Sequence, residues 1–183
     1  MSNHVVTKNA VRISYAFLNS PRKNEDGTAG KYGAQLIIPK TDAAVVKQLT
    51  EAVEAARALA IEDGVRNAKT FASPIRDGDG QKPRGGEYGP ECKGAWVINT
   101  SSWNKPGIVD RNVQPIIDPT QIYSGMWCRV DVTFKAFVTK SNSGITCYLN
   151  NLQKIRDDAP LGGSAAPAES VFEAVEGEDE FGL

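Results

Sequence analysis

This sequence contains few histidines and cysteines, and its carboxy-terminal part contains no basic residue. Its one histidine, His4, lies near the start, and no lysine or arginine follows Arg156. The three cysteines, Cys92, Cys128 and Cys147, are widely spaced and form no Cys-x-x-Cys pair, which argues against a zinc site or a disulfide framework. No apolar run is long enough to span a membrane, and the first residues lack the apolar core of a signal peptide. We therefore expect a cytoplasmic protein that has no metal, no cofactor and no membrane partner.

Signals of enzymatic chemistry are also missing. The sequence contains no phosphate-binding loop, no nucleophile elbow and no histidine placed to act as a base. The segment from Asp77 to Gly80 resembles the start of a calcium loop, but it lacks the later ligands and is expected to be a plain turn. Asp118 and Asp131 could in principle bind magnesium for nuclease chemistry, although no motif supports this. We expect a protein that is not an enzyme.

The charges are divided between a basic body and an acidic carboxy-terminal segment. Residues 1–156 contain all 21 lysines and arginines against 14 of the 22 acidic residues, a net charge of about +7. Residues 157–183 contain the other 8 acidic residues and no base. This asymmetry predicts a body that binds a polyanion and a tail that interacts with other proteins.

Alternation of apolar and polar residues predicts five β-strands. They cover residues 11–18, 32–38, 95–102, 129–139 and 145–155. The one convincing helix covers residues 42–63, where Thr41 or Asp42 can cap the start and Gly64 can end it. Because strands dominate and no βαβ rhythm occurs, we expect a mainly β fold, an antiparallel barrel or sandwich with the helix over one end or face. Two Gly- and Pro-rich stretches between the strands are expected to be long loops.

The predicted strand that begins at Arg129 has two different faces. One face, from Val130 to Val138, is apolar and belongs in a core. The other face carries Arg129, Lys135 and Phe137. A ring beside cations suits single-stranded nucleic acid, because the ring stacks on a base while the cations hold phosphates. The alternative is that Phe137 packs beneath a loop.

Cations alternate with aromatic rings again in a Gly-rich region later in the chain. The members are Lys82, Arg84, Tyr88, Lys93, Trp96, Trp103, Lys105 and Arg111. Trp103 lies in a polar run where nothing calls for a core residue, which favours base stacking, whereas the strand around Trp96 favours burial. Tyr15 and Tyr32, on the first two predicted strands, either line the same groove or form half of a core.

The sequence changes character at Ala159. From there it is rich in Pro, Gly, Ala and Ser, which is typical of a flexible linker, and its last residues are too acidic to fold alone. We therefore divide the chain into a domain of residues 1–158 and a linker with an acidic tail, residues 159–183. Near its end the tail carries a compact candidate recognition element: Glu178, Asp179, Glu180 and Phe181. Its carboxylates suit a basic groove and its ring suits a pocket, while the alternative is a tail that only aids solubility.

Several segments, taken in order, resemble phage single-stranded DNA-binding proteins of the OB-fold type, a family long known only as phage proteins of unknown function. The segments are VRISYAF (11–17), YGAQLIIPK (32–40), KGAWVI (93–98), PGIVD (106–110) and GMWCRVDVTFKAF (125–137). The resemblance implies a partly open, five-stranded OB-fold-like barrel that binds single strands with little sequence preference and protects them during phage DNA replication or recombination. It also implies that the acidic tail recruits replication or recombination proteins and competes with DNA, in the cytoplasm of the host cell.

Together these observations predict a non-enzymatic single-stranded DNA-binding protein. Its groove is expected between the strand that carries Phe137 and the segment 96–111. Two alternatives remain, a metal-dependent DNA-processing enzyme and a phage structural or adaptor protein whose barrel is only a scaffold. The first would degrade DNA in magnesium, and the second would bind no DNA.

Overall fold

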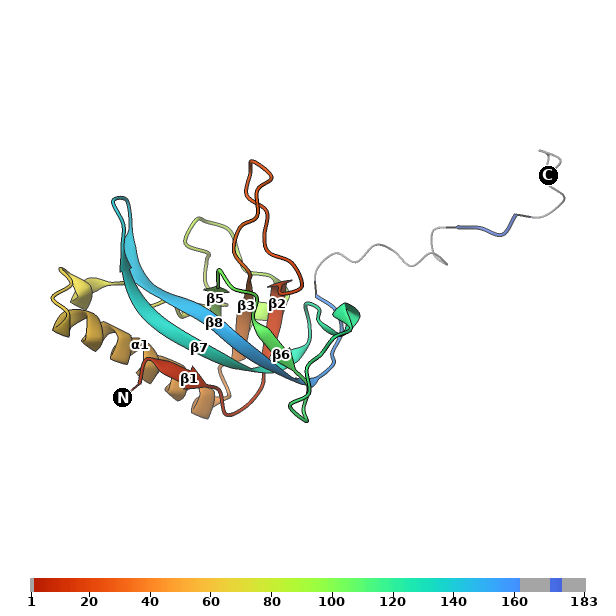
Figure 1. Cartoon of the computed structure of the whole chain (residues 1–183), viewed down its shortest axis with the longest axis horizontal. Helices are drawn as coiled ribbons and strands as arrows, with labels where there is room; N and C mark the ends of the chain where they lie inside the picture. Colours follow the sequence, from red (N-terminus) through yellow and green to blue (C-terminus); the bar gives the residue numbers. More distant parts are fainter. Residues whose placement is uncertain (1, 162–171, 176–183) are drawn as a thin grey trace.

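A five-stranded barrel forms the centre of the protein, in a computed structural model that describes residues 2–161 and 172–175. Around the barrel the strands follow the order β2–β3–β5–β8–β7, and β7 pairs again with β2 to close the ring (Figure 1). Their bounds are β2 Val11–Phe17, β3 Gly33–Pro39, β5 Ala95–Ser101, β7 Trp127–Val138 and β8 Ser143–Arg156. All five predicted strands are confirmed, as is the mainly β, OB-fold-like barrel.

One pairing differs from the antiparallel arrangement that the sequence predicts. β5 and β8 run parallel, with Thr100 opposite Cys147, while the other four neighbours in the ring are antiparallel. The reason is geometric, because directions cannot alternate all the way around a closed ring with an odd number of strands. A strand's own pattern does not reveal the direction of its neighbours.

Short elements outside the predicted strands and helix were not predicted from the sequence. They are β1 His4–Val6, β4 Arg76–Asp77, β6 Gly107–Val109 and the 3-10 turns η1 Ala68–Thr70, η2 Pro90–Cys92 and η3 Pro119–Gln121. β1 adds to the edge of β7, β4 pairs with β5, and β6 runs parallel to β8. Elements of two or three residues are too short to show an alternating pattern.

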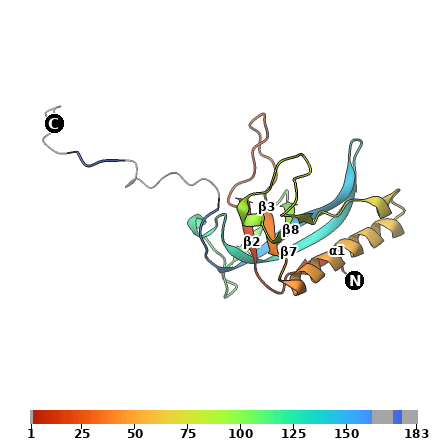
Figure 2. The same cartoon turned by 180° about the vertical axis from the view of Figure 1, so that it is seen from behind.

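The helix α1, Ala43–Glu62, packs beside β7 on the outside of the barrel (Figures 1 and 2). The Asp42 carboxylate accepts a hydrogen bond from the Val45 amide at 3.3 Å, and Gly64 after the helix has a φ of +75°. These contacts confirm both predicted helix ends. Six side chains of α1 are buried in the hydrophobic core: Val45, Leu49, Ala52, Val53, Ala56 and Ala60.

The long strands β7 and β8 extend beyond the barrel as a hairpin (Figure 1). Inside the barrel Val130, Val132 and Phe134 are at most 1% exposed, as predicted. Val138, which the alternation placed in the core, is 63% exposed. That expectation was wrong because Val138 lies at the end of the projecting hairpin, where no other strand covers it.

Residues 157–161, which we call the strap, lie against the barrel after β8 ends. The Ala159 carbonyl accepts a hydrogen bond from Arg12 Nη2 at 2.8 Å, and the Leu161 amide donates to the Ser124 carbonyl at 2.8 Å. Barrel contacts thus continue past the boundary expected after Asp158. Apart from residues 172–175, the rest of the expected linker and tail lies outside the described residues, and this includes Glu178, Asp179, Glu180 and Phe181.

Replacing Gly33 tests how closely β3 and β5 approach each other. A Cβ atom at Gly33 would overlap the carbonyl oxygen of Thr100. We therefore expect Gly33→Ala to lower the free energy of unfolding by about 1–3 kcal/mol, measured by urea unfolding. Gly80→Ala is the matched control, because the nearest heavy atom to its Cβ would lie 3.3 Å away. Equal stability of the two variants would contradict this account.

Candidate nucleic-acid interface

Two projections rise from the same side of the barrel. One is the loop of residues 18–32 between β2 and β3, and the other is the β7–β8 hairpin (Figures 1 and 2). The connection that leaves β5 lies between them, and the loop of residues 78–94 before β5 is seen best from behind (Figure 2). In OB folds the corresponding face, between these two kinds of loop, binds oligonucleotides and oligosaccharides.

A groove of about 600 Å³ lies on this side, over the outer faces of β2, β3 and β5. It is lined by Tyr15, Phe17, Arg22, Gln35, Lys82, Pro83, Arg84, Tyr88 and Asn99. Among these described residues three are cations and none is acidic. The groove is therefore an electropositive channel with aromatic walls.

A bulge in β2 directs two rings into the groove. The pairing of β2 with β3 shifts between Ser14 and Phe17, and Tyr15 within the shift has a φ of +46°. Tyr15 is 55% exposed and Phe17 is 38% exposed. The Ala16 amide donates to Ser124 Oγ at 3.0 Å, which holds the bulge in place. A tyrosine with positive φ is strained, and bulges that re-aim side chains are common beside functional sites.

Two of the three groove cations lie over aromatic rings. The Arg22 guanidinium is 5.0 Å from the centre of the Phe17 ring, and burial lowers the pKa of Arg22 below its ordinary value. Lys82 Nζ is 5.9 Å from the centre of the Tyr88 ring. Lys82 and Arg84 are exposed on a tight turn of the 78–94 loop, where the Lys82 amide donates to the Gly86 carbonyl at 2.8 Å. These cations can reach a phosphate beside a ring that can stack on its base.

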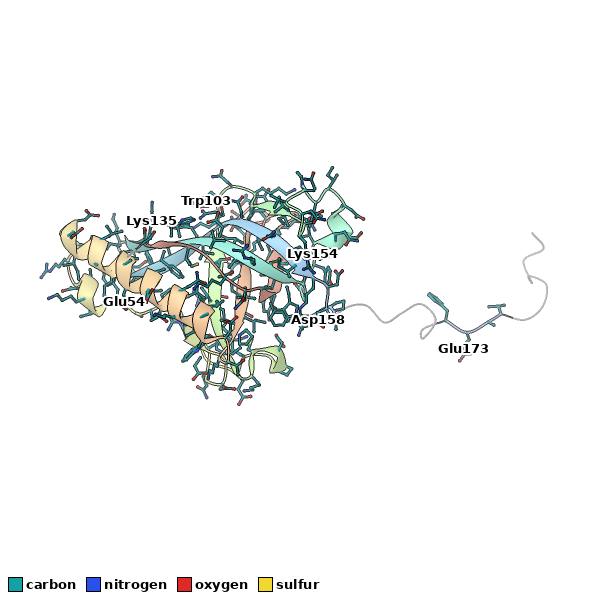
Figure 3. The ribbon with its side chains drawn as sticks, turned by 90° about the horizontal axis from the view of Figure 1, so that it is seen from below. Glu54, Trp103, Lys135, Lys154, Asp158 and Glu173 are labelled. Carbon is teal, nitrogen blue, oxygen red and sulfur yellow. The ribbon has the colours of Figure 1, made fainter. Side chains whose placement is uncertain are left out.

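The floor of the groove carries two amides. Gln35 and Asn99 are opposite each other on β3 and β5, and Gln35 Nε2 donates to Asn99 Oδ1 at 3.4 Å. Tyr32 bridges Ser102, so the register of β3 and β5 continues past their ends to Lys31 and Trp103. Because side chains alternate along a strand, these two residues lie on the same face as Gln35 and Asn99. Lys31 Nζ is 4.9 Å from the centre of the Trp103 ring, which is 69% exposed (Figure 3). Trp103 thus extends the aromatic face beyond the groove.

Other predicted site residues lie around this face. Tyr88 lines the groove but is only 6% exposed, and Tyr32 is half-buried and bridges Ser102. Lys105 is exposed near Trp103. On the projecting hairpin Lys135 is exposed and Phe137 is half-buried. Lys135 lines a separate pocket beside α1, so the structure does not bring all the predicted residues into the groove.

Four more predicted residues lie outside the groove lining, as do Tyr32, Trp103, Lys105, Lys135 and Phe137. Arg129 donates from Nε to the Thr7 carbonyl at 2.8 Å, so its charge is used within the fold. Trp96 is half-buried, as its strand position favours. Lys93 is exposed just beyond η2, and Arg111 is exposed after β6, where it lines a separate pocket. The groove described here lies between β2 and the 78–94 loop, whereas the sequence predicts a groove between the Phe137 strand and the 96–111 segment.

The groove also contains residues that the sequence analysis did not include among its site residues. Gln35 and Asn99 are uncharged, so no charge or aromatic pattern marks them, and Phe17 reads equally well as a core residue. Only the pairing of β3 with β5 brings the two amides together. Arg22 could have been recognised from the sequence, because it is a cation in the loop between the first two predicted strands.

The part of the chain that the structure describes contains no group of three or more histidine, cysteine, aspartate or glutamate residues placed to hold a metal ion. Asp131, considered for magnesium, accepts hydrogen bonds from His4 at 2.6 Å and from Asn151 at 2.9 Å. Within residues 2–161 and 172–175, no helix has the length and apolar character needed to cross a membrane.

A protein-family model described as Enterobacter phage Enc34, ssDNA-binding protein, matches residues 3–182. The chain belongs to this family. The resemblance found in the sequence is thereby confirmed over nearly its whole length. A relative of similar length is protein p50 of Acyrthosiphon pisum secondary endosymbiont phage 1, which is 24% identical over 183 residues, 94% of this chain and 95% of that protein.

Solved structures share the barrel of this Enc34-family chain. The single-stranded DNA-binding protein from bacteriophage Enc34, in complex with ssDNA, is 28% identical with a TM-score of 0.71, over 87% of this chain and 90% of that one. A C-terminal truncation of the Enc34 protein is 26% identical with a TM-score of 0.69, over 87% and 88%. The single-stranded DNA-binding protein gp2.5 of bacteriophage T7 is 16% identical with a TM-score of 0.59, over 96% and 98%, and shows a shared fold.

The exposure of Trp103 can be measured without a ligand. Trp103 is 69% exposed, whereas Trp96 and Trp127 are half-buried. We therefore expect Trp103→Phe to lower acrylamide quenching of the intrinsic fluorescence, because the most accessible ring is lost. Trp96→Phe is the control and should leave the quenching constant the same or slightly higher. A constant that stays the same or rises in Trp103→Phe would show that Trp103 is covered in solution.

Proposed function

We propose that this Enc34-family protein binds single-stranded DNA in the groove and catalyses no reaction. The observation that carries the proposal is an aromatic face with cations beside its rings. The residues are Tyr15, Phe17, Trp103, Arg22, Lys31, Lys82 and Arg84. Stacking contributes about 1–3 kcal/mol per base, and each cation neutralises a phosphate.

The chemistry of the groove favours single strands over duplex. Rings stack on the faces of unpaired bases, and every base has such a face, so little sequence preference is expected. The amides of Gln35 and Asn99 on the floor can bond to base edges that are free only outside a duplex. The Enc34 protein solved with ssDNA shares this barrel over 87% of the present chain, which supports the assignment.

The acidic tail is proposed to compete with DNA for the groove and to recruit replication or recombination proteins, in the cytoplasm of the phage's host. Of the 8 acidic residues after position 156, two belong to the strap. Asp157 is 2.6 Å from Lys154 Nζ, and Asp158 accepts from Trp127 Nε1 at 2.8 Å. The competing charge is therefore that of residues 162–183, which includes the candidate recognition element ending in Phe181.

The two alternatives give different results in a simple assay. A metal-dependent DNA-processing enzyme would shorten a labelled single strand in the presence of magnesium. A structural or adaptor protein would leave the strand intact and unbound. We expect an intact strand that is bound, with affinity that falls as salt rises.

Removing two groove cations should change the salt dependence of binding. Each cation that neutralises a phosphate on a single strand contributes about 0.7 to the slope of log affinity against log salt. We expect Lys82→Ala with Arg84→Ala to lower this slope by about 1.4 in a fluorescence titration with oligothymidylate. The matched control, Lys93→Ala with Arg111→Ala, removes the same charges outside the groove and should leave the slope nearly unchanged. The reverse ranking would move the interface to the second pair.

Deleting the tail should raise DNA affinity. A protein that ends at Leu161 keeps the strap but loses the acidic residues beyond it. Because screening at physiological salt limits charge interactions to about 8 Å, the gain should be larger at low salt. Affinity measured at both salt concentrations checks this. An unchanged affinity at low salt would show that the tail does not occupy the groove.

A further inference from the structure

The strap is held to the barrel by its two carboxylates. Asp157 accepts a hydrogen bond from the Tyr123 hydroxyl at 2.8 Å and pairs with Lys154, which holds its pKa below the ordinary value. Asp158 accepts from Trp127 Nε1, which likewise lowers its pKa (Figure 3 labels Lys154 and Asp158). Both carboxylates stay ionised and bonded at neutral pH. The strap therefore follows a fixed path over the barrel surface.

This path brings Leu161 beside the bulge of β2. The Leu161 amide donates to the Ser124 carbonyl at 2.8 Å, and the Ser124 hydroxyl accepts from the Ala16 amide inside the bulge at 3.0 Å. Gly125 leaves room for the strap, because a Cβ there would overlap the Ala159 carbonyl oxygen. Ser124 is thus bonded both to the strap and to the segment that carries the groove's first aromatic wall.

The Leu161 side chain contacts the opposite wall. It packs against a hydrophobic cluster on the outer face of β3 and β5, whose members are at most 6% exposed: Ile37, Tyr88, Cys92, Ala95 and Val97. Tyr88 follows directly after the tight turn that carries Lys82 and Arg84, and Gln81 bridges Glu87 at the base of that turn. Leu161 therefore packs against the cluster to which Tyr88, the residue that follows the cationic turn, belongs.

We infer that Leu161 is a positioning residue for the groove. Its amide holds Ser124, which in turn holds the bulge, and its side chain packs on the cluster that contains Tyr88, next to the turn with Lys82 and Arg84. It thereby sets the spacing between the aromatic wall and the cationic wall. This inference rests on the proposed function, because the effect is defined by DNA binding. It assigns to the DNA site a residue whose sequence reads as linker.

The test uses the full-length chain and oligothymidylate. Leu161→Ala should weaken binding about fivefold and lower the salt slope by up to about 1.4, because the two cations of the turn are no longer held over the strand. Leu161→Met keeps an apolar side chain of similar volume and should restore both values. Leu59→Ala, at an exposed leucine of α1, is the matched control and should change neither.

A double-mutant cycle separates positioning from general destabilisation. If Leu161 acts through the turn, its effect on DNA affinity should shrink once the turn's cations are gone. In a protein that already carries Lys82→Ala with Arg84→Ala, Leu161→Ala should weaken binding by less than about twofold more. Fully additive losses, or a Leu161→Ala protein with wild-type affinity and slope, would overturn the inference. Thermal unfolding of each variant shows that the barrel is folded at the assay temperature. If the wild-type chain itself fails to bind, the proposed function fails, whereas wild-type binding with an unaffected Leu161→Ala refutes positioning alone.

Discussion

Closure of the barrel by five strands is the constraint on which the rest of this structure depends. An odd ring needs one parallel contact, here between β5 and β8. β8 lies between β5 and β7 in the ring, so the chain crosses from β5 to β7 through a long connection. That connection supplies Trp103 beside the groove, and Ser124 and Gly125 under the strap. The topology that closes the barrel thus also provides residues for the site.

The long elements could be predicted from the sequence because alternation records which side of a strand is buried. β7 shows this well, since Val130, Val132 and Phe134 are buried where the pattern places them. The pattern fails at Val138, where the strand leaves the barrel, because a local sequence does not say how far the neighbouring strands extend. The direction of the β5–β8 pair was equally inaccessible, because direction is a property of the whole ring.

Composition predicted which types of residue form the candidate site better than it predicted which individual residues belong to it. Tyr15, Lys82 and Arg84 line the groove, and aromatic and cationic character alone marked them. Arg129 and Trp96 have the same character but are used by the fold, one bonded to Thr7 and the other half-buried. A sequence places residues along the chain, whereas a barrel decides which of them face the same direction. Which of these residues contact DNA stays a prediction.

The short pairing between β2 and β7 affects how the protein folds during its synthesis. Two residue pairs join these strands, Val11 with Cys128 and Arg12 with Trp127, and Ile13 bonds to Met126 and Gly125 just before β7. The strap crosses this short pairing, because Asp158 binds Trp127 on one side and lies 3.6 Å from Arg12 on the other. During synthesis β2 can pair with β3 early, whereas its other neighbour, β7, and the strap emerge from the ribosome much later. Barrel closure is a late, non-local event, of the kind that makes folding slow.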